Sequence, residues 1–366
     1  MYVDNSVGNN STANNLTVPH IVNYNFVDWI RMISMIGIVW AHTPLFGNNI
    51  NETSLNNVFF YLCFMNFFKF GVICFFMISG FLLSSKIQEE DTLLYVKKRI
   101  STTLNPYLFT LSILVAIFIF NTEILNKNYG YRLPQYLVEL ITNSMFWFLP
   151  NYWLCLIFLL LFKKNISKIR TGIIMLIILI IFSWIAVYSG QSKMPSYSCL
   201  GYVFYIWLGY MIANRHLTTY YSSISKIVLV IVSIFFFLLS SYESYHLYLN
   251  GSKEYFNILR ISNQLYSISV FILLIRLFNR KYNFKYLNPR KETFGIYLYH
   301  IFFASIMVTI SKFLTSQSFN VYTDNSYLLF AIHIIKFLII YFSTLILVKV
   351  LIKFKIGFLV QYKLKK

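Results

Sequence analysis

Long apolar runs alternate with short polar and basic segments along most of this chain. A run of roughly 17 to 25 apolar residues is long enough to cross a bilayer as a helix. The pattern predicts an all-α integral membrane protein, a bundle of about ten transmembrane helices. The predicted helices lie near Phe26–Leu45, Phe70–Ser84, Leu104–Asn121, Phe146–Phe162, Gly172–Ser189, Ser198–Ala213, Lys226–Tyr242, Phe256–Phe278, Phe294–Phe313 and Leu328–Leu351.

The polar sequence outside these runs is too short to build a soluble domain. Residues 1–25 are rich in Asn, Ser and Thr and contain no Lys or Arg, so we expect a disordered polar tail there. Residues 352–366 form a basic tail that we expect to lie on anionic lipid headgroups. A single membrane domain over residues 26–351 remains.

Composition agrees with this interpretation, because 58% of the residues are hydrophobic and only 12% are charged. The 31 Lys and Arg against 12 Asp and Glu give a net charge of +19, which in a soluble chain would suggest nucleic acid. In a membrane protein, an excess of basic residues is explained by their placement in cytoplasmic loops. If both termini are cytoplasmic, the cytoplasmic loops and tail hold 20 Lys and Arg and the outer loops hold five. This bias favours cytoplasmic termini, a multi-pass protein of the inner membrane, and lipids as contacts with no nucleic-acid partner.

Familiar soluble-enzyme motifs are missing from the sequence. The four cysteines form no C-x-x-C pair, and no metal-binding or phosphate-loop motif occurs, so we expect neither a metal nor a permanently bound cofactor. Chemistry must then come from polar groups inside the membrane, where they are costly and functional by default.

The first predicted helix holds three such groups, Asp28, Arg31 and His42. Arg31 and His42 are eleven residues apart, about three helical turns plus 20°, so they share one face at depths about 16.5 Å apart. Asp28, three residues before Arg31, can pair with its guanidinium. The alternative is that Asp28 and Arg31 reach the cytoplasmic headgroups while His42 sits at the outer interface.

Four further segments are distinctive. The first is Phe70–Leu82, in which the small residues Gly71, Ser79 and Gly80 permit close approach of another helix. The others are the basic segment Tyr95–Ile100 leading into Asn105–Tyr107, then Trp147–Pro150, and Gly295–His300.

In this order, and with this topology, these elements resemble the membrane-bound acyltransferase family 3, whose bacterial members mostly O-acetylate carbohydrates. The resemblance runs from about Asn25 to Tyr341. Its most specific element is the pattern of an arginine, ten residues and a histidine, matched by Arg31 and His42. It implies acetyl-CoA as donor. We expect the stand-alone type of the family, because no hydrolase-like domain follows the last predicted helix. Lys98 and Arg99 lie in the segment that the family is thought to use for the donor.

One position departs from the family. Many members carry a second arginine three residues after the one matched by Arg99, where this chain has Thr102. Lys97 and Lys98 keep the segment basic, so anion attraction survives while a bidentate grip is weakened.

Other polar residues are weaker candidates. Trp147 and Tyr152 lie at the outer start of the fourth predicted helix and are possible sugar platforms, but aromatic belts are common in membrane proteins and we favour that interpretation for both. His300 follows two tyrosines and can face the same cavity as His42 or be a structural histidine. We expect Arg260 to reach the outer interface.

The resemblance, together with these residues, implies an O-acyltransferase that moves acetyl from acetyl-CoA to a cell-surface or secreted polysaccharide or its lipid-linked precursor. His42 suits a general base because imidazole has a pKa near 6.5, and Arg31 would bind the donor. The acyl group could also be succinyl. The rival class is an exporter or flippase of carbohydrate units, which would more often show repeated halves and broken helices.

Overall fold

The computed structural model describes residues 25–43, 55–87, 91–124, 132–142, 144–190, 200–278, 287–316 and 326–354, together with Ile356 and Leu359. Within these ranges all regular structure is helical. A membrane-embedded backbone has no water to bond, so each segment satisfies its own peptide groups as a helix. The helices are α1 (Asn25–Ala41), α2 (Leu55–Asn66), α3 (Gly71–Leu83), α4 (Thr92–Ile119), α5 (Leu133–Thr142), α6 (Phe148–Leu161), α7 (Ile169–Ser183), α8 (Val203–Asn214), α9 (Leu217–Ser223), α10 (Lys226–Leu249), α11 (Ile261–Phe278), α12 (Pro289–Ser316) and α13 (Ser326–Lys353), with 3-10 turns at Met145–Trp147 and Lys163–Asn165 and π-helical turns at Phe120–Ile124 and Trp184–Tyr188.

The all-helical prediction is confirmed for the described residues, and the number of spans is not. Seven described helices are long and apolar enough to cross a membrane, or eight if α5 and the helix after it form one bent span. The expected count of ten included α1, which has 17 residues, and α8, which has 12. Hydropathy cannot separate such short buried helices from spans. Residues 1–24 and 360–366, most of the two predicted tails, lie outside the described residues.

Two predicted boundaries were wrong. The basic segment expected to be a loop before Leu104 is the first part of α4, because the Asp91 side chain accepts a hydrogen bond from the Leu93 backbone N–H at 3.2 Å and caps the helix at Thr92. Lys69, expected in an outer loop, lies in the short turn between α2 and α3, inside one continuous candidate span that runs Val58–Leu83.

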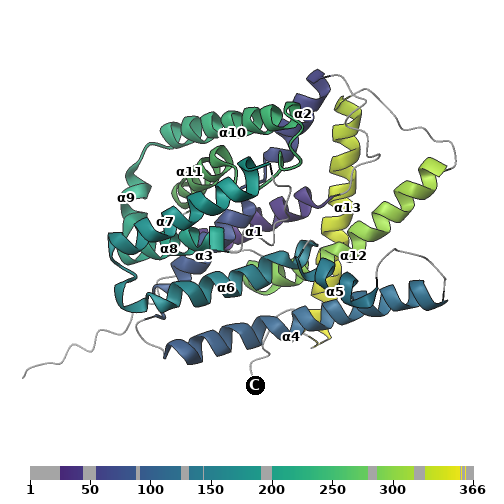
Figure 1. Cartoon of the computed structure of the whole chain (residues 1–366), viewed down its shortest axis with the longest axis horizontal. Helices are drawn as coiled ribbons and strands as arrows, with labels where there is room; N and C mark the ends of the chain where they lie inside the picture. The colour runs from purple at the N-terminus through teal and green to yellow at the C-terminus, as the bar shows by residue number, and fades with distance from the viewer. Residues whose placement is uncertain are drawn as a thin grey trace, which may run out of the picture.

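Helix α1 occupies the centre of the bundle (Figure 1) and packs against α3, α11, α12 and α13. Helices α10 and α4 run along opposite edges of the molecule in the same view. Large apolar side chains are exposed along the outer helices, including Ile177 and Ile180 on α7 and Ile231 and Ile234 on α10, as expected for faces that contact lipid.

Glycines set the closest helix contact, between α3 and α8. A Cβ on Gly80 would lie 1.8 Å from the Ile206 carbonyl oxygen, and a Cβ on Gly209 would lie 1.9 Å from that of Met77. Each helix therefore presents a glycine to the backbone of the other. Gly71 lies in the same way against the Ser34 carbonyl of α1, so the predicted close approach is confirmed for Gly71 and Gly80.

Candidate active site

A cavity of about 500 Å³ opens between α1, α3, α4, α6 and α12. Its described lining contains no Asp or Glu. It contains five basic residues, Arg31, Lys86, Lys98, Arg99 and Arg290. We call this the basic cavity, and its charge favours an anionic ligand.

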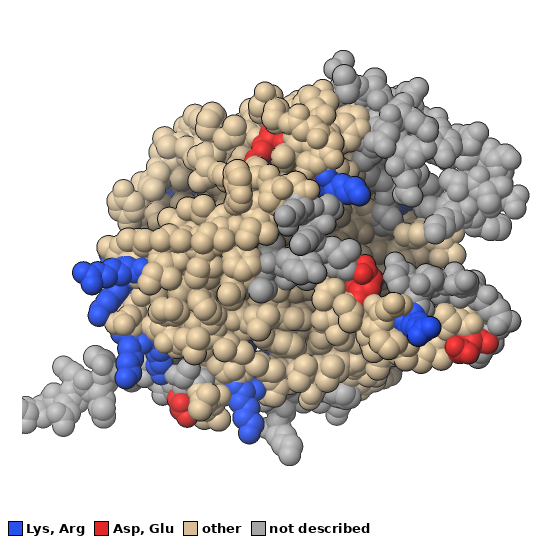
Figure 2. Space-filling view, in the orientation of Figure 1, with Lys and Arg blue, Asp and Glu red and all other residues tan. Residues whose placement is uncertain are grey.

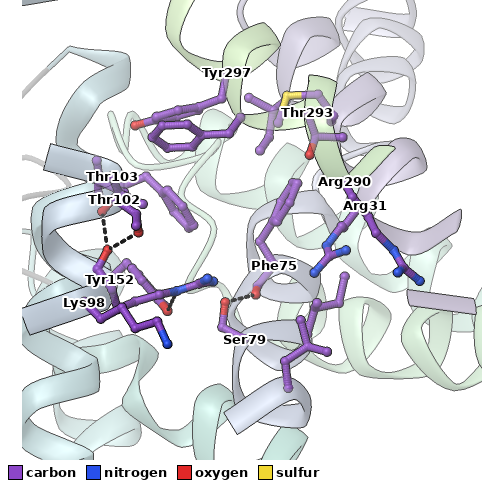
Figure 3. Close-up of a pocket in the computed structure, with 18 of the residues that line it drawn as sticks. Arg31, Phe75, Ser79, Lys98, Thr102, Thr103, Tyr152, Arg290, Thr293 and Tyr297 are labelled. Atoms are coloured by element: carbon purple, nitrogen blue, oxygen red, sulfur yellow. Dashed lines mark hydrogen bonds between the residues drawn. The ribbon is translucent and has the colours of Figure 1, made fainter. Parts of the chain in front are cut away.

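One wall of the basic cavity is organised by a carboxylate behind it. Asp28 does not line the cavity, but its oxygens bind Arg31 Nη1 at 2.9 Å and Arg290 Nε at 2.8 Å. Arg290 comes from the start of α12, 262 residues away in sequence. The Asp28 side chain is only 14% exposed, so it holds two guanidiniums on one side of the cavity, where Figure 3 shows them together.

The opposite wall is the first part of α4 (Figure 3), which carries Lys98, Arg99 and Thr102. Arg99 Nε donates a hydrogen bond to the Tyr152 hydroxyl of α6 at 3.2 Å. The Thr102 hydroxyl donates back to the Arg99 carbonyl at 2.9 Å. Because this segment is helical, its charges stand at fixed spacings on a rigid element.

A second cavity, of about 260 Å³, lies farther along α1. His42, Lys69, Trp147 and Tyr202 line it. The connection between α10 and α11 adds Lys253, Glu254, Phe256, Asn257 and Ile258. We call this the histidine cavity.

A second imidazole lies against His42. The rings of His42 and His300 have centroids 5.6 Å apart. His300 Nδ1 is 2.8 Å from the Tyr297 carbonyl and 3.1 Å from that of Ile296, and a carbonyl can only accept, so Nδ1 carries the hydrogen. His300 Nε2 then presents a lone pair, and it has no hydrogen-bond partner within the described part of the chain.

The connection that covers the histidine cavity is tied down by Arg260, which was predicted to reach the interface and is instead fully buried. Its guanidinium donates to the Ser240 carbonyl at 2.5 Å, to Asn66 Oδ1 at 2.6 Å and to the Asn257 carbonyl at 3.1 Å. Hydropathy suggested the interface because an isolated arginine is costly inside a bundle, and these three acceptors offset that cost.

Most of the residues singled out from the sequence line one of these two cavities or lie directly beside one, whereas Arg260 lines neither. Arg31, Lys98 and Arg99 line the basic cavity with Asp28 behind it, whereas His42 and Trp147 line the histidine cavity. His300 contacts His42.

Sequence reasoning missed several residues. Arg290 counted only as one charge of a predicted basic loop, and Tyr152 was assigned to an aromatic belt. Lys69 was placed in an outer loop, and it lines the histidine cavity with its Nζ 5.1 Å from the centroid of the Phe256 ring. Local sequence carries no signal that distinguishes these residues from ordinary loop and interface residues.

Comparison with known proteins gives one match. The family model described as an acyltransferase domain matches residues 24–353. No curated protein and no solved structure matches the chain.

Proposed function

Because the chain belongs to the membrane-bound acyltransferase family 3, we propose that it is an O-acyltransferase that moves acetyl from acetyl-CoA to a polysaccharide hydroxyl. The acceptor is a cell-surface or secreted polysaccharide or its lipid-linked precursor. One observation carries the proposal: two cavities adjoin along α1, one lined by cations that include Arg31 and the other containing His42.

The basic cavity suits the donor. Coenzyme A carries phosphate groups, and arginine binds phosphate oxygens through paired, charge-assisted hydrogen bonds. In our proposal Arg31 and Arg290 bind phosphate from one side while Lys98 and Arg99 do so from the other. The pantetheine arm then extends along α1 toward the histidine cavity.

The histidine cavity suits the chemistry. A hydroxyl oxygen of the acceptor attacks the thioester carbonyl carbon, and His42 takes the hydroxyl proton as the new C–O bond forms. The carbon–sulfur bond breaks, and the CoA thiolate recovers the proton, so an ester and free CoA result. The His300 Nε2 lone pair can accept a hydrogen bond from the ring of His42 and steady it. Trp147 offers an aromatic face for the sugar.

This arrangement agrees with a multi-pass protein of the inner membrane that takes its donor from the cytoplasm. Figure 2 shows Lys and Arg side chains gathered at the left-hand end of the molecule, the end at which α4 and α10 begin in Figure 1. Such a cationic end favours the cytoplasmic side.

The test is acetyl transfer from labelled acetyl-CoA into the carbohydrate fraction by membranes that carry wild type, His42→Ala or Arg31→Ala at matched expression. We expect transfer by the wild type, loss with His42→Ala, and a raised KM for acetyl-CoA with Arg31→Ala. Matched controls are His246→Ala and Arg215→Ala, because both side chains are exposed and line neither cavity.

Equal losses in the controls and the cavity variants would contradict the assigned roles. A wild type that transfers no acyl label, while carbohydrate fails to reach the surface without the gene, would favour an exporter instead.

A further inference from the structure

Three side chains border both cavities: Ile38 of α1, Phe148 of α6 and Tyr297 of α12. Ile38 and Tyr297 are each 5% exposed, and Phe148 is half-buried. Since they come from three different helices and face both cavities, they form the wall between them. We call this set the dividing wall.

The dividing wall is stiff. The rings of Phe148 and Tyr297 meet edge to face, with centroids 5.7 Å apart and an interplanar angle of 66°. Tyr297 is fixed because its hydroxyl donates a hydrogen bond to the Met145 carbonyl at 3.0 Å. Phe148 also packs against Phe76, with centroids 5.0 Å apart. Ile38 is β-branched, which restricts its rotamers in a helix.

The dividing wall also lies at an informative depth. Ile38 is seven residues after Arg31 and four before His42, or about 10.5 Å and about 6 Å along α1. A donor held at Arg31 that reacts at His42 must carry its thioester past Ile38. Any chain beyond the carbonyl must fit between the dividing wall and the acceptor in the smaller, 260 Å³ cavity.

We propose that Ile38, Phe148 and Tyr297 set the length of the acyl group, admitting acetyl and excluding four-carbon groups such as butyryl and succinyl. This inference rests on the proposed acyltransferase function. One methylene in an apolar pocket changes kcat/KM by roughly 10- to 200-fold. Butyryl has two more carbons than acetyl, so we expect kcat/KM for butyryl-CoA to be at least about 100-fold lower than kcat/KM for acetyl-CoA. The phosphates of the donor bind the basic residues of the basic cavity whichever acyl group is attached, so butyryl-CoA still binds and competitively inhibits acetyl transfer.

The experiment measures kcat/KM for acetyl-CoA, propionyl-CoA and butyryl-CoA with wild type, Ile38→Ala and Phe148→Leu. We expect the butyryl-to-acetyl ratio to rise at least about tenfold in both variants, because each removes volume from the dividing wall. The matched control is Val39→Ala. Val39 is on the same helix and fully buried but lines neither cavity, so its ratio should stay that of the wild type.

Several outcomes would overturn the inference. One is wild type that transfers butyryl as fast as acetyl, a result that needs no variant to fold. A second is an unchanged ratio in active Ile38→Ala or Phe148→Leu, and a third is an equal rise with Val39→Ala. In each case acyl transfer itself still stands, whereas no transfer from any thioester would instead refute the proposed function.

Discussion

Replacing Thr102 with arginine should improve use of the donor. Thr102 lines the basic cavity three residues after Arg99 on the same face of α4, so the two side chains start about 5–6 Å apart. Thr102→Arg also restores the second arginine that this chain lacks relative to the family it resembles. Two guanidiniums at this spacing can bind one phosphate group from two sides.

The expected gain is modest. A pair of charge-assisted hydrogen bonds to phosphate contributes about 3 to 4 kcal/mol. Ordering the new side chain costs about 2 kcal/mol. Repulsion from Arg99 at about 6 Å costs about 0.7 kcal/mol at the dielectric constant of water. A net gain on the order of 1 kcal/mol remains, which corresponds to about a fivefold lower KM for acetyl-CoA.

The assay is acetyl transfer at varied acetyl-CoA concentration and two ionic strengths. We expect a lower KM with Thr102→Arg, an almost unchanged kcat, and a smaller advantage at high salt. The control is Ser101→Arg, which adds the same charge one residue earlier at an exposed position outside the cavity. An unchanged KM in folded Thr102→Arg, or an equal fall in both variants, would refute the reasoning.

Three further predictions concern the base and the packing around both cavities. The logarithm of kcat/KM should fall with unit slope as pH drops below the pKa of His42, because a protonated imidazole cannot accept a proton. A kcat/KM that does not fall as the pH is lowered would exclude His42 as the base. Gly209→Ala should lower the unfolding temperature in detergent by an amount equivalent to about 1 to 3 kcal/mol, since its Cβ would lie 1.9 Å from the Met77 carbonyl oxygen, and an unchanged temperature would contradict that packing. Arg260→Ala should lower the free energy of unfolding by about 3 kcal/mol or more, because it leaves buried acceptors unpaired. The exposed control Arg215→Ala should lower it by less than about 0.5 kcal/mol. Similar unfolding temperatures for the two variants would show that the hydrogen bonds of Arg260 do not stabilise the fold.

Sequence alone predicted those features of the site that involve residues of one helix. Helical periodicity put Arg31 and His42 on one face, and both line cavities along α1. The pairing of Asp28 with Arg31 at 2.9 Å is also a local contact, three residues apart, and it is confirmed. The residues that complete the basic cavity came from elsewhere in the chain, and the resemblance to a family identified only Lys98 and Arg99 among them.

The sequence by itself determined that this is an all-helical membrane protein, because apolar run length and the need to satisfy backbone hydrogen bonds within lipid are local properties. Only the tertiary structure decided that Asp28 also binds Arg290, that Arg260 is buried on Asn66 and Ser240, and that Ile38 stands between two cavities. These contacts join residues far apart in the chain. They depend on how closely helices pack, which glycines at positions such as 80 and 209 permit and which hydropathy does not record.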